Sequence, residues 1–280
     1  MHSRGDIMKR LYISDLDGTL LNNDQRVSAE SERLLRECTA NGKYFTFATA
    51  RTAASAIKIT ENTGVNIPCV LMNGVSVYDT VRREYVKNEY ISADSSMSVA
   101  RLLDSIGQSA FMYKISGNKI YCEYTSLDSP EMREFFEIRR TRYDKPFLQI
   151  DSFSSSCDGS VVYFSILGSR ERLEKVRGAA EKVKGLKYAF YSDIYSENSW
   201  YLEIFSEHAS KYNGVRFLRE HYGFDEIVCF GDNLNDLSMF EASDRKIAVA
   251  NANETLKAAA DEIIGSNLEN SVAKYISDSL

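Results

Sequence analysis

Two acidic motifs carry the clearest chemical signal in the sequence. The first is the string Asp15-Leu16-Asp17-Gly18-Thr19-Leu20, and the second is Gly231-Asp232-Asn233-Leu234-Asn235-Asp236. Paired carboxylates of this kind can hold a hard cation such as Mg²⁺, which prefers oxygen ligands. Taken alone, each string is also compatible with an Asx turn or a helix cap, because Asp, Asn and Gly are common turn residues.

Weaker signals accompany these motifs. Thr49-Ala50-Arg51 follows an apolar run, and a hydroxyl with backbone N–H groups at a helix start suits a phosphate, although a Thr N-cap is the alternative. Lys211 is expected at a helix start, where an ordinary surface charge is the alternative. Asn73-Gly74 follows another apolar run and is also typical of a simple turn.

The elements that must position these residues alternate between strands and helices at both ends of the chain. The pattern predicts strands at the positions 9–14, 44–48, 69–72, 226–230 and 246–250. Between them, Ser28 is expected to cap a first helix that ends at Asn41-Gly42, a second helix is expected at 53–63, and another at 212–222. This alternation predicts an α/β fold with a doubly wound, Rossmann-like parallel sheet. Because ligands bind at the carboxyl ends of such strands, both acidic motifs are expected to converge on one crevice.

The middle of the chain has a different rhythm. A helix followed by two strands is expected twice, at roughly 95–124 and 170–205, and the first strand pair turns at Gly117-Asn118. Such hairpins predict a separate antiparallel α+β unit. We therefore expect a discontinuous core domain at 1–83 and 200–280, interrupted by an inserted domain at 84–199.

Composition excludes several classes of protein. The chain has 280 residues, 44% of them apolar and 26% charged, with a formal net charge of −6, as in ordinary folded soluble proteins. The acidic excess argues against a general partner of nucleic acid or anionic membranes, and no apolar run is long enough for a membrane span. No secretory signal is evident, and the five cysteines form no CxxC, so free thiols in a cytoplasmic protein are expected. Met8 is an equally plausible start, so residues 1–7 are expected to be a poorly ordered extension. No obligate protein partner is indicated.

Taken together, the motifs resemble those of the haloacid dehalogenase superfamily, in particular its Cof-type, subfamily IIB branch with a C2-type α+β cap. The resemblance covers essentially the whole chain, and the first to fourth motifs correspond in order to 15–20, Thr49, Lys211 and 231–236. The segments 248–252 and Ser266-Asn267 also resemble the closing part of that branch. Two departures are Ala50, where Gly is usual, and the residues 212–214 after Lys211, where Gly often follows directly.

The resemblance implies a Mg²⁺-dependent phosphatase that hydrolyses a small phosphate ester, commonly a sugar phosphate, through an aspartyl-phosphate. Asp15 would be the nucleophile, and Asp17 would be the general acid and then the general base. Asp15, the backbone carbonyl of Asp17, and Asp232 would hold the metal. The phosphate would be bound by Leu16, Thr49, Ala50, Lys211 and Asn235, with supporting positions at Asp236, Arg51 and Asn73. Asp236 would orient Lys211, and the inserted domain would select the substrate.

Two other functions remain open at this point. A phosphomannomutase-like phosphotransferase is one, because such enzymes of the same superfamily carry a related cap. A non-catalytic metabolite-binding regulator is the other, although retention of both Asp15 and Asp17 argues against it. A P-loop kinase has no support, because the sequence contains no GxxxxGK[ST] string.

Overall fold

The computed structural model describes residues 8–192 and 199–279 and divides the chain into two units. The first unit joins Met1–Lys87 to Ser210–Leu280, and the second is the continuous segment Asn88–Ala209. The expected domain boundary at residue 200 differs from this division. It separated β11 (Trp200–Ser206) from strands with which β11 forms antiparallel pairs in the second unit. The N-terminal extension expected at residues 1–7 lies outside the described residues.

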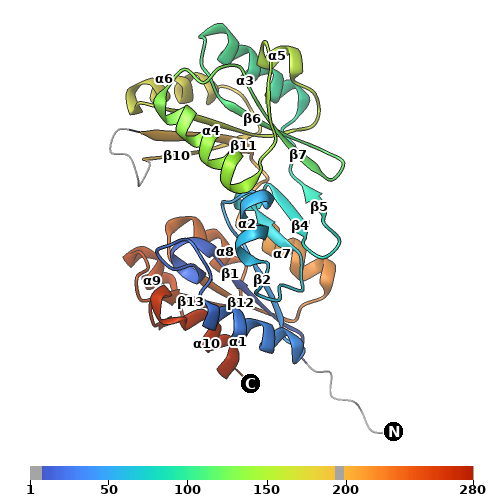
Figure 1. Ribbon diagram of the computed structural model, residues 1–280, viewed down its shortest axis with the longest axis vertical. Helices are drawn as coiled ribbons and strands as arrows, with labels where there is room; N and C mark the ends of the chain where they lie inside the picture. Colours follow the sequence, from blue (N-terminus) through green and yellow to red (C-terminus); the bar gives the residue numbers. More distant parts are fainter. Residues whose placement is uncertain (1–7, 193–198, 280) are drawn as a thin grey trace. The chain divides into compact units, whose positions relative to one another are not determined.

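A five-stranded sheet forms the centre of the first unit (Figure 1). Its order is β14 (Glu262–Ile264), β13 (Arg245–Val249), β12 (Glu226–Gly231), β1 (Arg10–Ser14) and β2 (Tyr44–Phe47). All neighbouring strands pair in parallel, which confirms the expected α/β sheet. Four consecutive residues of β1 are buried, as expected for a strand that is covered on both faces of the sheet.

Helices flank this sheet (Figure 1). They are α1 (Ala29–Ala40), α2 (Ala53–Thr60), α7 (Lys211–Tyr222), α8 (Leu237–Glu241), α9 (Glu254–Ala259) and α10 (Ser271–Asp278). The expected cap of α1 is confirmed, because the hydroxyl of Ser28 accepts a hydrogen bond from the backbone N–H of Ser31 at 3.0 Å. Gly223 ends α7 with a φ of 66°, a left-handed conformation that glycine adopts without strain.

A second, three-stranded sheet extends the first unit. It contains β3 (Cys69–Leu71), β4 (Ser76–Asp79) and β5 (Glu84–Asn88), of which only β3 was expected from the sequence. A parallel bridge joins Ala48, just after β2, to Val70 in β3. The chain that leaves β2 therefore runs beside β3, and Thr49 donates its backbone N–H to the carbonyl of Val70 at 2.9 Å.

The parallel register brings the ends of the strands to one edge of the large sheet. Ser14, the last residue of β1, lies opposite both Phe47 of β2 and Phe230 of β12. At the far side of the sheet, Val249 of β13 lies opposite Ile264 of β14. The segments that follow these five strands must therefore emerge at a common edge, which is where ligands bind in open α/β sheets.

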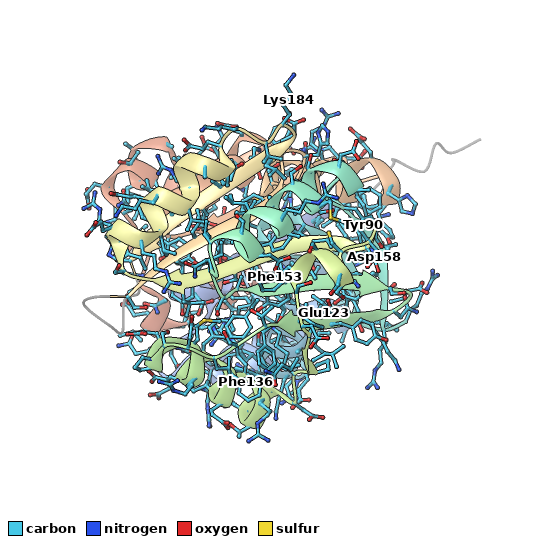
Figure 2. All side chains as sticks on the ribbon, turned by 90° about the horizontal axis from the view of Figure 1, so that it is seen from above. Tyr90, Glu123, Phe136, Phe153, Asp158 and Lys184 are labelled. Carbon is cyan, nitrogen blue, oxygen red and sulfur yellow. The ribbon has the colours of Figure 1, made fainter. Side chains whose placement is uncertain are left out.

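The second unit contains a six-stranded sheet of mostly antiparallel pairs. Its elements are α3 (Ala93–Ser105), β6 (Phe111–Ser116), β7 (Lys119–Tyr124), α4 (Pro130–Tyr143), β8 (Phe147–Gln149), α5 (Phe153–Ser156), β9 (Val161–Gly168), α6 (Arg170–Ala180), β10 (Leu186–Ser192) and β11. The expected hairpin of β6 and β7 is confirmed, with Gly117 at a φ of 56°, whereas β8 and α5 were not expected. Residues of α3, α6 and the sheet share one apolar core that includes Phe153. Figure 2 shows α4, which carries Phe136, on the opposite side of the sheet from α3 and α6.

Two further expectations concern the whole described chain. Within residues 8–192 and 199–279, no helix is both long and apolar enough to cross a membrane. The cysteines are free thiols, as expected, and most of them are buried: Cys38, Cys69, Cys122 and Cys229 are buried, and Cys157 is partly exposed.

Candidate active site

The chain turns sharply as soon as β1 ends at Ser14. Asp15 begins the turn and donates its backbone N–H to the carbonyl of Phe230 at 2.9 Å. Gly18 has a φ of 77°, and a Cβ at this position would lie 2.3 Å from Oδ2 of Asp232. Only glycine therefore allows the carboxylate of Asp232 to lie this close to the backbone of the turn.

This turn separates the two aspartates of the first motif. The sequence suggested that Asp15 and Asp17 share one face of a strand, but the strand ends before either of them. Asp15 is 5% exposed, whereas the side chain of Asp17 is 50% exposed. The two carboxylates therefore occupy different environments, as expected if they have different chemical roles.

Lys211 is a buried cation rather than a surface charge. Its residue is 1% exposed, and its Nζ donates to Oδ1 of Asp15 and to Oδ1 of Asp236, each at 2.6 Å. Lys211 is the first residue of α7, and this helix packs closely against β3. A Cβ on Gly214 would lie 2.5 Å from Cγ1 of Val70, so the glycine permits the close packing that places Lys211.

Asp236 is held by several hydrogen bonds and has no exposed surface. While its Oδ1 accepts from Lys211, its Oδ2 accepts from the backbone N–H groups of Asp232 and Asn233 at 3.0 and 3.1 Å. A Cβ on Gly231 would lie 2.7 Å from the Cβ of Asp236, so this glycine makes room for the carboxylate. Asp236 therefore both orients Lys211 and fixes the turn that presents Asp232.

Burial and mutual repulsion dominate the electrostatics of this cluster. Chiefly because of burial, the pKa of Asp15 lies well above its ordinary value; Lys211 opposes this shift, and Asp236 and Asp232 add to it. Burial, followed by the charge of Asp236, raises the pKa of Asp232 to about 6. Burial lowers the pKa of Lys211, but the carboxylates of Asp15 and Asp236 raise it by more, so the amine stays protonated.

The acidic cluster has the donor chemistry of a hard-cation site. One carboxylate oxygen from each of Asp15, Asp232 and Asp236 lies within 4.8 Å of the others. Lys211 supplies one positive charge to these three carboxylates, which leaves an excess of negative charge when all are ionised. Since the donors are oxygens, the residues fit a divalent cation such as Mg²⁺ or Ca²⁺. Asp236, whose two oxygens already accept hydrogen bonds, is the least suited of the three to be a ligand.

The side chain of Asp17 lies with Arg51 rather than in this cluster. Nε and Nη2 of Arg51 donate to the two carboxylate oxygens of Asp17 at 2.7 and 2.6 Å. The sequence placed Asp17 among the metal-holding residues and Arg51 in a supporting position. The structure gives Arg51 a direct, two-pronged contact with Asp17, a geometry that fixes the plane of the carboxylate.

The segment Thr49-Ala50-Arg51 lies just before a helix, not in the first turn of that helix. Thr49 has no exposed surface, and its hydroxyl accepts from the backbone N–H of Arg51 at 3.1 Å. The expected helix start at residue 53 is confirmed, because α2 begins at Ala53 with Thr52 as its cap, and Thr49 is therefore not the N-cap that was its alternative role. Ala50 is exposed. The hydroxyl of Thr49 thus shapes the loop that presents the backbone around Ala50.

The remaining expected residues are divided between the surface and the core. Asn235 is exposed, and its side-chain N–H donates to Oδ1 of Asn73 at 3.4 Å. Asn73 has a φ of 54°, and its backbone N–H donates to the carbonyl of Thr49 at 2.9 Å. The side chain of Leu16 is fully buried, so only its backbone is available at the turn. Asn235 and Asn73 therefore link the second acidic motif to Thr49.

The structure adds three residues to the site that sequence reasoning did not assign. Thr19 donates its hydroxyl to Oδ1 of Asp232 at 2.9 Å. Asn251 donates to the carbonyl of Gly18 at 2.8 Å, and Asn267 donates to the carbonyl of Leu21 at 2.8 Å. Thr19 stands inside the first motif, and both asparagines stand in segments already recognised as family-like, but their partners depend on contacts across more than 200 residues.

We expect Asp232→Asn to raise the free energy of unfolding of the EDTA-treated protein by about 1–3 kcal/mol at pH 7. The raised pKa of Asp232 means that folding disfavours its ionised form. The ionisation of Asp232 therefore does not affect the free energy of unfolding below the unfolded pKa of about 4. It lowers this free energy progressively as the pH rises to about 6, and the effect is constant above that pH. Asn removes this charge and keeps an oxygen for Thr19.

Urea unfolding of both proteins at pH 4 and pH 7 measures this effect. The two proteins should have similar stability at pH 4, and the variant should be more stable at pH 7. A variant that is equally or less stable at pH 7 would show that the ionised carboxylate of Asp232 is not disfavoured in the fold.

Comparisons with known proteins agree with this site. The family model for haloacid dehalogenase-like hydrolases matches residues 12–276. Phosphatase YwpJ of Bacillus subtilis is 27% identical over an alignment of 287 residues, gaps included, that covers 94% of this chain and 97% of the relative. The 5-amino-6-(5-phospho-D-ribitylamino)uracil phosphatase YwtE of the same organism is 27% identical over 280 residues, covering 94% of this chain and 95% of the relative.

A solved structure shows the same fold. The crystal structure of a Thermotoga maritima protein superposes with a TM-score of 0.81 at 24% identity, and the match covers 98% of each chain. The family model spans both acidic motifs and all of the chain between them. The chain is therefore an enzyme of the haloacid dehalogenase-like hydrolase family.

Proposed function

We propose that this haloacid dehalogenase-type phosphatase is Mg²⁺-dependent and hydrolyses small phosphate monoesters, with sugar phosphates as the preferred class, through an aspartyl-phosphate on Asp15. The observation that carries the proposal is the buried carboxylate of Asp15, bonded to Lys211 at 2.6 Å and clustered with Asp232. One relative, YwtE, is named for a substrate with a phosphorylated ribityl group, which supports a sugar-like ester.

The first step is attack by a carboxylate oxygen of Asp15 on phosphorus. A bond forms between that oxygen and phosphorus, the bond from phosphorus to the ester oxygen breaks, and Asp17 gives its proton to the departing alkoxide. In the second step water attacks the same phosphorus, Asp17 takes its proton, and the carboxylate of Asp15 is restored. The buried position of Asp15 suits the first role, and the half-exposed position of Asp17 suits exchange of protons.

Positive charge near Asp15 keeps its carboxylate reactive. Lys211 already faces Asp15 in the fold. Asp15, Asp232 and the backbone carbonyl of Asp17 would hold Mg²⁺, which would offset the repulsion between an anionic carboxylate and an anionic phosphate. The pKa of Asp15, raised by burial, then no longer opposes the ionised form that attacks phosphorus.

The remaining motif residues are proposed to bind the phosphoryl oxygens. These are Leu16 and Ala50 through their backbone, Thr49, Lys211 and Asn235, supported by Asp236, Arg51 and Asn73. The buried hydroxyl of Thr49 and the contact of Asn235 with Asn73 support this set. All of these residues belong to the first unit, so we assign selection of the leaving alcohol to the second unit, Asn88–Ala209.

The test is release of inorganic phosphate from a panel of sugar phosphates, nucleotides and vitamin phosphates. We expect the wild-type protein to turn over sugar phosphates with Mg²⁺ and to lose this activity in EDTA, with recovery when Mg²⁺ is restored. Sugar-phosphate isomerisation without net release of phosphate would instead indicate a phosphotransferase. Inactivity across the panel with Mg²⁺ present would overturn the proposal and favour a metabolite-binding regulator.

A further inference from the structure

Two asparagines connect the far side of the sheet to the turn that carries Asp17. Asn251 follows β13 and Asn267 follows β14, whereas the turn follows β1, which is two strands away from β13. The side-chain N–H of Asn251 donates to the carbonyl of Gly18 at 2.8 Å, and that of Asn267 donates to the carbonyl of Leu21 at 2.8 Å. They therefore hold the turn at two points on the C-terminal side of Asp17.

The two asparagines also hold each other. The backbone N–H of Asn267 donates to Oδ1 of Asn251 at 3.0 Å. Asn267 is fixed in turn by its neighbour Ser266, whose N–H and hydroxyl both donate to Glu269, at 2.6 and 2.7 Å. Both ends of the Asn251 amide are thus used within the fold, which suits a positioning role better than contact with a ligand.

The bracing acts on Asp17 more directly than on Asp15. Asp15 has its own anchors, because its backbone N–H donates to Phe230 and its carboxylate accepts from Lys211. Arg51 holds the carboxylate of Asp17 but not its backbone, which has extended angles (φ −74°, ψ 122°) and is followed at once by Gly18, whose carbonyl Asn251 holds. Loss of the brace would therefore shift Asp17 while leaving Asp15 in place.

We propose that Asn251 and Asn267 form a brace that positions Asp17 for proton transfer to the leaving alcohol, an inference that rests on the proposed function. They are positioning residues, because they act through the backbone of the turn. A misplacement of about 1 Å in a reacting group is enough to lower turnover on the order of 10²-fold.

The test compares two leaving groups. A hexose 6-phosphate needs a proton on its departing oxygen, whereas p-nitrophenyl phosphate releases a stable phenolate without one. For Asn251→Ala and Asn267→Ala we expect kcat/KM to fall about tenfold or more with the hexose phosphate and less than about threefold with the aryl phosphate. This constant covers the steps up to departure of the leaving group and excludes the later hydrolysis, in which Asp17 acts as the base for both substrates. Asn251→Asp, which keeps the shape and the acceptor oxygen but lacks the donor, should give the same pattern.

Two controls separate this role from simple stabilisation. Asn253→Ala removes a helix cap in the same loop, where the side chain accepts from the N–H of Thr255 at 2.9 Å, and should leave the ratio of the two kcat/KM values unchanged. In an Asp17→Asn background, the brace substitutions should add no further loss. Equal losses of kcat/KM with both substrates, or a further loss in that background, would overturn the brace.

The variant Asp17→Asn shows whether a failed test contradicts the brace alone or also the proposed function. Asp17→Asn itself should lose far more of its kcat/KM with the hexose phosphate than with the aryl phosphate. If Asp17→Asn loses equally with the two substrates, the acid role of Asp17 is wrong and the proposed brace is rejected as well. If Asp17→Asn shows the preference and the brace variants do not, only the brace is rejected.

Discussion

Replacing Asp15 by Asn is expected to lower phosphatase turnover by about 10⁴-fold or more, because it removes the attacking oxygen rather than weakening its surroundings. An amide is a poor nucleophile toward phosphorus. Asp236 also bonds to Lys211, but its other oxygen already accepts from two backbone N–H groups, so it is not positioned to replace Asp15. The loss should be equally large with alkyl and aryl phosphates, since both need the attack. Release of inorganic phosphate under saturating Mg²⁺ measures it.

The variant should remain folded. Lys211 keeps its 2.6 Å bond to Asp236, and the Asn side chain can still offer an oxygen to Lys211. Circular dichroism and thermal unfolding check this directly. Asp24→Asn is a matched control, because it makes the same chemical change at an exposed position and should keep full activity. Wild-type protein quenched in acid during turnover should carry a phosphoryl group on Asp15, and undiminished turnover by Asp15→Asn would refute covalent catalysis there.

Most of the fold of the first unit can be predicted from local patterns of apolar residues in the sequence. Buried parallel strands have few polar residues, so the runs that became β1, β2 and β12 are easy to recognise. Short edge strands lack this signal. Residues of β5 are all partly exposed, and β8 and β14 each span only three residues, so nothing in their composition separates them from loops.

The ends of the inserted unit were harder to place for a different reason. β11 was expected as a strand, but a strand carries no mark of the sheet to which it belongs. The sheet to which β11 belongs is decided by its pairing with β9 and β10. Neither of these strands is joined to β11 by a short turn. The expected helix–strand–strand repeat at 170–205 already included this strand, and the pairing agrees with the repeat rather than with the boundary placed at residue 199.

The site shows the same division between local and distant information. The sequence supplied the residue types at the ends of β1 and β12, which parallel topology then brought to one edge. It could not supply the partner of Asp17, because Arg51 follows a different strand and reaches Asp17 through its long side chain. Nor could it show that Lys211 is buried, since a single lysine at a helix start has no pattern of its own.

Lys211→Met is expected to destabilise the protein by about 3–5 kcal/mol at pH 8, the largest stability effect of any substitution in this site. Methionine preserves most of the length of the side chain but removes the one charge that faces both Asp15 and Asp236. Two buried carboxylates then remain near each other without a cation. Turnover should also fall, by about 10²-fold or more, because the amine near the phosphoryl oxygens is lost.

The loss of stability should depend on pH with a definite sign. Burial already raises the pKa of Asp15, and removing Lys211 removes an opposing influence, so the pKa should rise further. Ionised Asp15 is disfavoured more strongly in the variant than in wild type, so the difference in stability grows as the pH rises above the folded pKa of wild-type Asp15, which already lies above the unfolded pKa of about 4. Urea unfolding in EDTA should therefore show a small difference from wild type at pH 4.5 and a large one at pH 8.

A second substitution tests whether charge is the cause. Asp236→Asn in the Lys211→Met background removes one of the two uncompensated carboxylates, while the Asn oxygen can still accept from the backbone N–H groups of Asp232 and Asn233. Stability at pH 8 should then recover in part, which gives a favourable coupling in the double-mutant cycle. If the double variant is as unstable as the sum of the single variants, or if the penalty is the same at both pH values, the cost of Lys211→Met comes from packing. In that case the buried lysine would not be the counter-charge that opposes the rise in the pKa of Asp15.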